Sequence, residues 1–235
     1  MQPSDTAYPR FKTRLTQAEL EQFYTPTDEE LAFCASVTLS PTTRLGFVVL
    51  LKTFQRLGYF VPSNKVPEAV IEHIATVIKR SPDREGLRRY DQSEARRKHL
   101  AVVRRFLGVK PFSAQGKTLL RATLSEAALT KEDVADIVNV GIEILVCHRY
   151  ELPAFDTLVR EARAGRAATN QALYEQVQCA LGKTGAAFLD SLFVVGDDSR
   201  RVSPWHDLKQ DPAKPTVYGM RDLLVRFEQL TALSS

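Results

Sequence analysis

Cysteine is scarce in this sequence of 235 residues, and its placement argues against a disulfide-stabilised fold. The three cysteines, Cys34, Cys147 and Cys179, are odd in number and far apart, which indicates buried thiols in a reducing cytosol. The four histidines are also scattered, and no CxxC or HxxxH pair offers a metal site. We therefore expect neither a disulfide framework nor a bound metal.

Long apolar runs are also missing. No run approaches the roughly 20 residues that a transmembrane helix needs, and the richest stretch, Leu45–Leu57, is interrupted by Lys52, Gln55 and Arg56. The first residues lack the basic start and apolar centre of a signal peptide. Hydrophobic residues still make up 44% of the chain, enough to build folded cores. We expect a cytoplasmic protein without a membrane partner.

The motifs of nucleotide hydrolysis and metal catalysis are incomplete. Gly116-Lys117-Thr118 and Gly182-Lys183-Thr184 lack the glycine that a phosphate-binding loop has five positions earlier. Nothing indicates that Asp190, Asp197 and Asp198 converge on a metal, because Asp197 and Asp198 follow each other in a polar stretch. Cys147 and His148 are adjacent on a predicted helix and point about 100° apart. We predict no enzymatic activity, no cofactor and no small-molecule ligand.

Helical periodicity dominates the chain and predicts an all-α fold. In residues 1–82 we expect three helices: one capped by Thr25 or Thr27, one from Ser40-Pro41 to Gly58, and one over about 67–80. The middle helix is apolar around most of its circumference, which predicts the centre of a small bundle. Three helices with short turns are typical of a helix-turn-helix architecture.

Residues 83–182 predict a second helical bundle. We expect a helix from about 93 to Gly108 with the apolar stripe Leu100, Val103, Phe106 and Leu107. Further helices are expected at 114–128, at 130–149 with Thr130 and Asp133 as a capping box, and from about 152 to 181. Residues 183–235 predict the start of a connecting region, with helices near 184–195 and 218–233 around a loop at 196–215.

Positive charge is concentrated in one part of the chain. The net charge is +4, but thirteen Lys or Arg stand against four Asp or Glu between Lys79 and Arg121, a local net of +9 that leaves −5 elsewhere. Such asymmetry indicates a basic face and a polyanionic partner. A solvated helical surface explains the same pattern, and charge alone leaves the two interpretations close.

Several blocks of sequence resemble the N-terminal region of the large transposases of the Tn-three family. In chain order they are LTQAELEQFYTPT at 15–27, SPTTRLGF at 40–47, LKTFQRLGYF at 51–60, RKHL at 97–100 with FLG at 106–108, ELPAFDTL at 151–158 and SPWHDLK at 203–209. The resemblance spans almost the whole chain in the family's order. It implies a bacterial protein of transposition and DNA recombination, associated with the nucleoid.

In that family the N-terminal region is helical and recognises the terminal inverted repeats of the transposon. Strand transfer belongs to a later RNase H-like domain with a magnesium-binding Asp/Asp/Glu triad, and those acids match no residue of this chain. The resemblance therefore implies sequence-specific binding of double-stranded DNA by two tandem helix-turn-helix-like bundles, 1–82 and 83–182, with 183–235 starting a connecting region. The alternative is a protein–protein or dimerisation module without DNA specificity, with a second transposase copy as partner.

The basic residues expected at the DNA fall into four groups. The expected phosphate contacts are Arg96, Arg97, Lys98, Arg104 and Arg105, of which Arg97, Lys98, Arg104 and Arg105 share one helix face. The second bundle offers Arg160, Arg163 and Arg166. Between the bundles Lys79, Arg80, Arg88 and Arg89 would follow the backbone. Arg44, Lys52 and Arg56 lie in the resembling blocks, although they could simply solvate a core helix.

Overall fold

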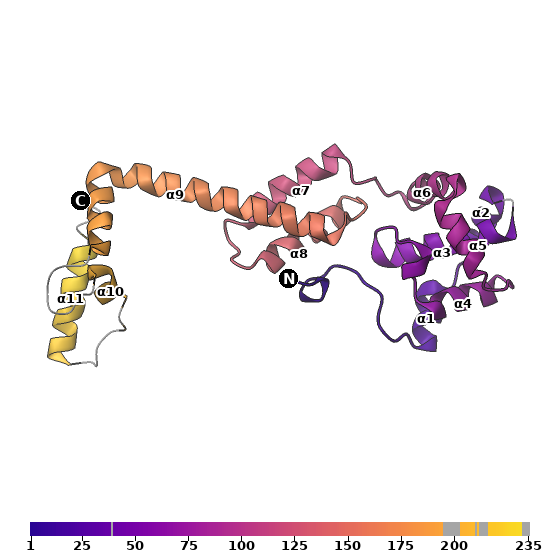
Figure 1. The fold of residues 1–235 in the computed structure, drawn as a ribbon, viewed down its shortest axis with the longest axis horizontal. Coiled ribbons are helices and arrows are strands. Elements are labelled where there is room, and N and C mark those ends of the chain that lie inside the picture. Colours follow the sequence, from indigo (N-terminus) through magenta and orange to yellow (C-terminus); the bar gives the residue numbers. More distant parts are fainter. Residues whose placement is uncertain (39, 195–202, 210, 212–215, 232–235) are drawn as a thin grey trace. The chain divides into compact units, whose positions relative to one another are not determined.

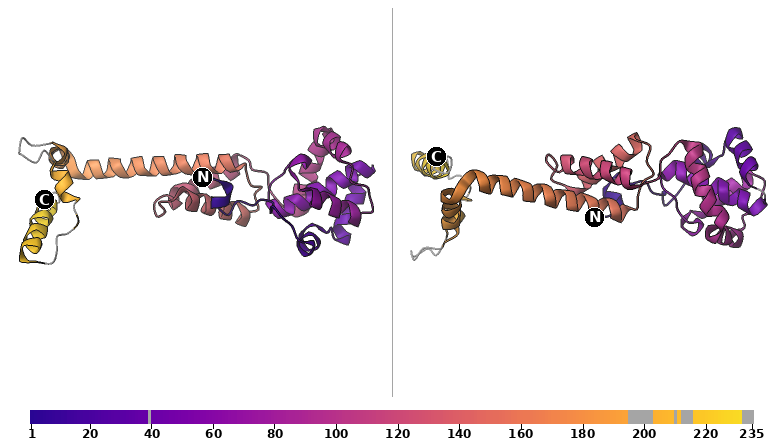
Figure 2. Two further views of the ribbon diagram at one scale, coloured as in Figure 1. Left: turned by 60° about the horizontal axis from the view of Figure 1, so that its bottom comes forward. Right: turned by 90° about the horizontal axis from the view of Figure 1, so that it is seen from above.

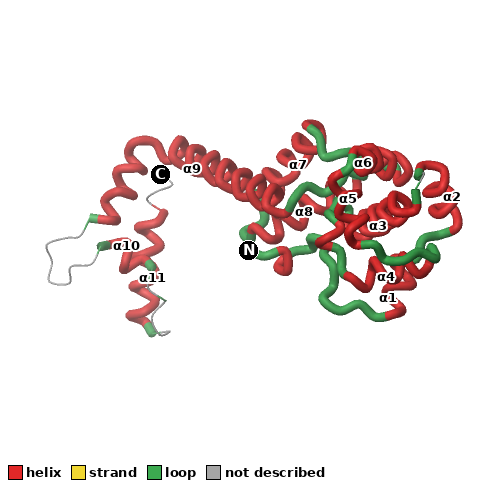
Figure 3. Tube along the Cα trace, turned by 45° about the vertical axis from the view of Figure 1, so that its right-hand side comes forward, coloured by secondary structure: helices red, strands yellow, loops and turns green. Residues whose placement is uncertain are grey.

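The computed structural model describes residues 1–38, 40–194, 203–209, 211 and 216–231. Within these residues the chain folds into helices joined by loops, with one isolated bridge between Lys110 and Tyr150 (Figures 1 and 3). The predicted all-α fold is confirmed. The chain forms two compact units, residues 1–168 and 169–235. The expected division into binding modules at about 82 and 182 stays a prediction.

Among the described residues, unit 1 contains ten complete helical elements and the beginning of an eleventh, α9. In chain order they are η1 (Pro3–Asp5), α1 (Gln17–Tyr24), α2 (Asp28–Val37), α3 (Pro41–Leu57), η2 (Ser63–Lys65), α4 (Glu68–Val77), α5 (Arg84–Gln92), α6 (Glu94–Leu107), α7 (Ala114–Ala127), α8 (Val134–Cys147) and the beginning of α9 (Phe155–Phe193). Unit 2 holds the rest of α9, α10 (Pro204–Leu208) and α11 (Val217–Thr231).

Local capping signals set the ends of the first helices. The side chains of Thr16, Thr27 and Ser40 each accept a hydrogen bond from the backbone N–H three residues on, at the starts of α1, α2 and α3. Gly58 ends α3 with φ +74°, a left-handed conformation that favours glycine. The predicted caps at Thr27, Ser40 and Gly58 are confirmed.

The first hydrophobic core surrounds α3. Its residues from Leu45 to Phe54 are buried, and α5 and α6 add Leu87 and Val103 to the same core. A Cβ at Gly46 would lie 2.5 Å from the ring of Tyr90, so α3 and α5 approach too closely for a larger residue. Our sequence prediction started the helix only after residue 92 and missed α5, because nearly every residue of this short segment is polar.

The second hydrophobic core lies among α7, α8 and the start of α9, which run side by side (Figures 1 and 2). Leu120, Leu124 and Ile137 are fully buried there. The predicted helices at 114–128 and 130–149 are confirmed, but the latter begins later than expected. Its N-cap is Asp133, which accepts from the backbone N–H of Ala135 at 2.8 Å, whereas Thr130 belongs to the turn after α7.

The C-terminal elements agree only in part with the sequence prediction. α9 breaks at Gly182 (φ +61°, ψ −169°), the residue predicted to stop this helix. α10 lies inside 196–215, so the prediction of a continuous loop there is wrong at Pro204–Leu208. Most of that stretch, including Asp197 and Asp198, and the last residues of the predicted 218–233 helix lie outside the described residues.

The prediction that the three cysteines are buried holds for only one of them. Cys34 is buried, but Cys147 and Cys179 are exposed. Cys147 follows Leu145, a buried residue of α8, by two positions, which turns it roughly 200° away at 100° per residue. Its side chain therefore faces solvent although the helix around it is apolar.

Candidate nucleic-acid interface

The α6 helix has one buried and one basic exposed face. Ser93 caps its start by accepting from the backbone N–H of Arg96 at 3.2 Å, and Gly108 ends it with φ +64°. His99 and Val103 are buried against the first core. The opposite face carries the exposed residues Arg97, Lys98, Ala101 and Arg105. This stripe follows the i, i+4, i+8 spacing of one helix side.

The cations of this stripe are available for a partner. Arg97 and Arg105 form no ion pair within the part of the chain that the structure describes. Lys98 pairs with Glu94 at 3.2 Å, but both side chains are more than 70% exposed. Such exposed pairs contribute little in water and are readily exchanged.

Arg104 does not lie on the exposed face with Arg97, Lys98 and Arg105, although the sequence predicted all four on one side of the helix. Its Nε–H donates to the Glu151 carboxylate at 2.7 Å, and its guanidinium lies 5.0 Å from the centre of the Phe60 ring. The side chain is half-buried. Arg104 therefore ties α6 to the segments before α9 and after α3.

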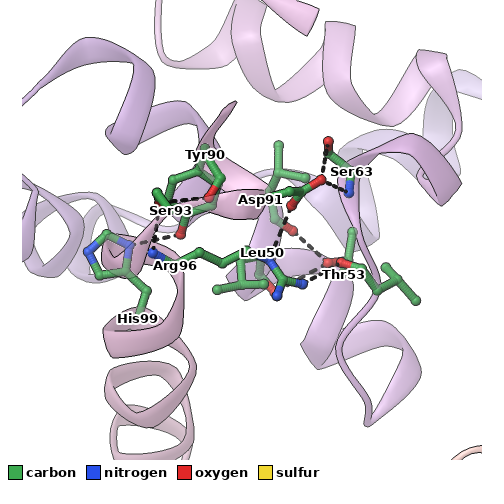
Figure 4. Close-up of polar contacts among 10 residues, drawn as sticks. Leu50, Thr53, Ser63, Tyr90, Asp91, Ser93, Arg96 and His99 are labelled. Atoms are coloured by element: carbon green, nitrogen blue, oxygen red, sulfur yellow. Dashed lines mark hydrogen bonds and ion pairs between the residues drawn. The ribbon is translucent and has the colours of Figure 1, made fainter. Parts of the chain in front are cut away.

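Arg96 also faces the interior (Figure 4). Its Nε lies 3.1 Å from an Asp91 carboxylate oxygen, an ion pair without the alignment of a hydrogen bond, and its Nη2 donates to the Val61 carbonyl at 3.2 Å. Asp91 in turn accepts from the backbone N–H and hydroxyl of Ser63 at 2.7 and 2.6 Å. This network joins α5, α6 and η2.

A second buried contact fixes the turn between α5 and α6. The Tyr90 hydroxyl and His99 Nδ1 are 2.8 Å apart, and both residues are buried (Figure 4). Burial lowers the pKa of His99 and raises the pKa of Tyr90, because each charged form loses hydration. Both groups therefore stay neutral near pH 7, and their contact holds α6 in place.

The three basic residues of α3 differ in burial and in the partners of their charged groups. Lys52 is buried and pairs with Glu30 at 3.1 Å. Arg44 is half-buried, and its Nε has no hydrogen-bond partner among the described residues. Arg56 is exposed, with its guanidinium 4.5 Å from the centre of the Phe23 ring. Only Arg56 of this group presents its charge to solvent.

The connecting basic residues Lys79, Arg80, Arg88 and Arg89 are all exposed. Lys79 follows α4 with φ +53°, and the Arg80 N–H donates to the Ala75 carbonyl at 2.8 Å. This is the helix-ending geometry in which glycine is usual. Arg149 repeats it after α8 with φ +56°.

Arg149 and Lys110 extend the exposed α6 face, and our sequence analysis missed both. A Cβ at Gly108 would lie 3.5 Å from Arg149 Nη1, which places this guanidinium beside the end of α6. The Lys110 N–H donates to the Arg149 carbonyl at 2.7 Å. No local pattern reveals this juxtaposition, since it depends on a bridge between segments 40 residues apart.

A buried carboxylate of α9 is surrounded by Lys117 and Arg121 of α7 and by Arg160 of α9. Glu161 is 5% exposed and lies 2.7 Å from Arg121 Nε, 3.4 Å from Lys117 Nζ and 3.8 Å from Arg160 Nη2. The hydrogen bond from Arg121 is the main reason that the pKa of Glu161 is lowered. Arg160 and Arg163 are exposed and Arg166 is half-buried.

Comparison with known proteins identifies the family. Residues 3–164, more than half of the chain, match the family described as a domain of unknown function, DUF4158. The chain belongs to this family. The match covers both hydrophobic cores and the exposed face of α6. The DUF4158 chain is also 25% identical over 195 residues to the transposase for transposon Tn2501 of Escherichia coli.

That alignment covers 82% of the DUF4158 chain and 19% of the transposase, so the chain spans about a fifth of its relative's length. The two matches support the resemblance to the N-terminal region of Tn-three-family transposases. They relate the chain to transposition.

The described residues offer no metal-binding group, phosphate-binding loop or membrane-spanning helix beside the basic surface. Among the described residues of the DUF4158 chain, no three His, Cys, Asp or Glu side chains are grouped to hold a metal ion. Gly116-Lys117-Thr118 lies in the first turns of α7, where Lys117 turns to Glu161. No described helix combines the length and apolar character that crossing a membrane requires.

Proposed function

We propose that this chain binds double-stranded DNA sequence-specifically at the terminal inverted repeats of a transposon, as the non-catalytic N-terminal part of a transposase. The observation that carries the proposal is the exposed face of α6, whose two arginines lack internal partners among the described residues. In this proposal strand-transfer chemistry belongs to the part of the transposase that this chain does not span, and the protein acts at the bacterial nucleoid.

The dimensions of α6 suit the major groove. An α-helix with its side chains is about 10–12 Å in diameter, and the major groove is about 12 Å wide and admits one. Arg97 and Arg105 are about 12 Å apart along the axis of α6. Their guanidinium groups can reach phosphates on either side of the groove. Ala101 between them lets the helix approach the base edges and can contact a thymine methyl group. In this arrangement α5 and α6 act as the helix-turn-helix pair.

The other exposed cations form the surrounding phosphate contacts. We assign Lys98, Arg149 and Lys110 to the backbone beside α6, and Lys79, Arg80, Arg88 and Arg89 to the backbone before it. Arg56, Arg160 and Arg163 are candidates outside these groups, and Arg166 is less accessible. Lys52, Arg96 and Arg104 act through the fold, since their charges are already paired. Arg44 is half-buried, and we assign it no DNA contact.

Fluorescence anisotropy tests the proposal with two duplexes of equal length and composition, one carrying the terminal repeat and one scrambled. The chain should prefer the terminal repeat, and its affinity should fall steeply with salt, with about −0.9 in log–log slope for each neutralised phosphate. The Arg97→Ala, Arg105→Ala variant should lower that slope by about 1.8 and keep its helical circular dichroism.

Arg221→Ala, which removes an exposed arginine of α11, is the matched control and should bind like the parent. Equal binding of the double variant and the parent would contradict the assignment of α6. Equal affinity for the two duplexes would contradict sequence specificity.

A second candidate function is favoured by exposed apolar side chains in unit 2. Leu173, Tyr174 and Val177 are exposed on α9, as are Leu224 and Phe227 on α11. Such surfaces often mark protein–protein contacts, and a second transposase copy is the proposed partner. Light scattering of the parent and of Leu173→Glu, Val177→Glu tests this. A tight dimer that is indifferent to DNA would favour this function over duplex recognition.

A further inference from the structure

A cavity of about 770 Å³ lies between the two hydrophobic cores of unit 1. Its wall is formed by four segments that are distant in sequence: the N-terminal segment, the turn after α3, the segment after α6 and the segment before α9. The volume lies within the roughly 300–1,000 Å³ of small-ligand pockets. The duplex-binding proposal does not use this cavity.

Aromatic rings held in fixed positions line the cavity. Tyr8 stacks on Tyr59 with ring centres 5.0 Å apart. Their hydroxyls donate to the carbonyls of Pro153 and Pro9 at 3.0 and 2.9 Å, so the polar end of each ring is already bonded. Tyr59 remains half-buried and keeps part of its surface accessible, as do Phe60 and Phe112 on the same wall. A rigid ring loses little entropy when a planar ligand stacks on it.

The charges around the cavity favour an anion. Glu151 and Arg104 line it but neutralise each other in their ion pair. Arg10 and Lys65 also line it, are exposed, and form no ion pair among the described residues. Two free cations beside accessible aromatic rings match a ligand that combines a planar ring with negative charge.

We propose that this cavity binds one unpaired nucleotide of a DNA strand, with its base against the aromatic wall and its phosphate at Arg10 and Lys65. Aromatic rings stack on any base, whereas in a duplex the base faces are covered by neighbouring pairs. The cavity is therefore a second nucleic-acid site, distinct from α6 in the form of DNA it accepts. It serves a single-stranded or extrahelical nucleotide.

A blocking substitution tests the site without removing any of its groups. Ala154 is exposed at the cavity and contributes its carbonyl to the start of α9, so Ala154→Trp adds bulk without disturbing that backbone contact. Ala122→Trp, at an exposed position of α7, is the matched control. The probe is a labelled single-stranded octathymidylate, titrated by anisotropy with the full chain at fixed salt, in parallel with the terminal-repeat duplex.

Ala154→Trp should weaken octathymidylate binding by about five- to a hundredfold, the range of losing one base–aromatic stack, and leave duplex binding unchanged. Ala122→Trp should change neither. Arg97→Ala, Arg105→Ala should weaken the duplex far more than the single strand, so the failure of either proposal is recognisable by itself. Unchanged octathymidylate binding by a folded Ala154→Trp variant would overturn the inference.

Two measurements keep the test decisive if Ala154→Trp does not fold. Photocrosslinking of the parent chain to a 5-iodouracil octamer should label Tyr59, Phe60 or Phe112, and crosslinks confined to other surfaces would overturn the proposal. A glutamate octapeptide should displace the octathymidylate poorly. Equal displacement by this peptide would mean that charge alone is recognised, and would also overturn it.

Discussion

Replacing Arg105 by alanine should weaken duplex binding without changing stability, whereas replacing its neighbour Arg104 should do the reverse. Arg105 is exposed and has no ion pair in the described part of the chain, so its loss should change the free energy of unfolding by no more than about 0.5 kcal/mol. If it contacts one phosphate, the log–log salt slope should fall by about 0.9.

Arg104 is held inside the fold. Its removal breaks a hydrogen bond between charged groups, worth about 1.5–3 kcal/mol, and a contact with the Phe60 ring worth about 0.5–1 kcal/mol. Glu151 is then left half-buried without its partner. We expect Arg104→Ala to lower the free energy of unfolding by about 2 kcal/mol or more, with the salt slope of the folded variant unchanged.

Urea denaturation and anisotropy at several salt concentrations measure the two effects on the same preparations. The two variants remove the same charge from adjacent positions, so each is the control for the other. Equal loss of salt slope in both would refute the reasoning, because net charge rather than side-chain direction would then govern binding. A destabilised Arg105→Ala would show that its exposure has been misjudged.

Three further predictions concern the fold that supports the interface. Lys52→Ala should lower the free energy of unfolding by about 3–5 kcal/mol in urea because the buried Glu30 carboxylate loses its counterion and keeps only its hydrogen bonds from Gln55 and the Thr27 N–H; replacing both Lys52 and Glu30 by apolar residues should recover most of this, and no recovery would refute the ion-pair explanation. The pKa of Glu161 is lowered below 4.5 in the folded protein, so its ionised carboxylate stabilises the fold. This stabilisation is fully present above pH 4.5 and is lost as the pH falls through the folded pKa. Glu161→Gln should therefore flatten the acid limb of a stability–pH curve, and an identical limb would exclude this role. Gly46→Ala should cost about 1–3 kcal/mol in the same urea assay, since its Cβ would lie 2.5 Å from the Tyr90 ring; a neutral effect would mean that the ring can move aside.

Much of the secondary structure follows from local signals in the sequence. The caps at Thr27 and Ser40 and the break at Gly58 act within a few residues and are found where the pattern predicts them. α5 escaped prediction because its buried side consists mainly of Leu87 and Tyr90. A helix with so few apolar residues is stabilised by the partner that covers them, here α3.

The sequence predicts that the basic residues together form a positive surface, but it does not predict where each side chain lies. Their number between Lys79 and Arg121 indicates a positive surface, but the sequence does not say which charges remain free. Arg104 pairs with a carboxylate 47 residues away and Lys52 with one 22 residues away. Arg149, which no helix pattern placed beside α6, reaches it through the bridge at Lys110.

Local signals in the sequence are enough to predict a helical chain, the bounds of most of its helices and the segment that is rich in positive charge, because capping, periodicity and composition act over a few residues. Which arginines face solvent, which are bound inside, and how four distant segments meet around an aromatic cavity follow from the packing of the helices. Ion pairing and cavity formation depend on packing between remote elements, and no local pattern encodes which remote group a side chain meets.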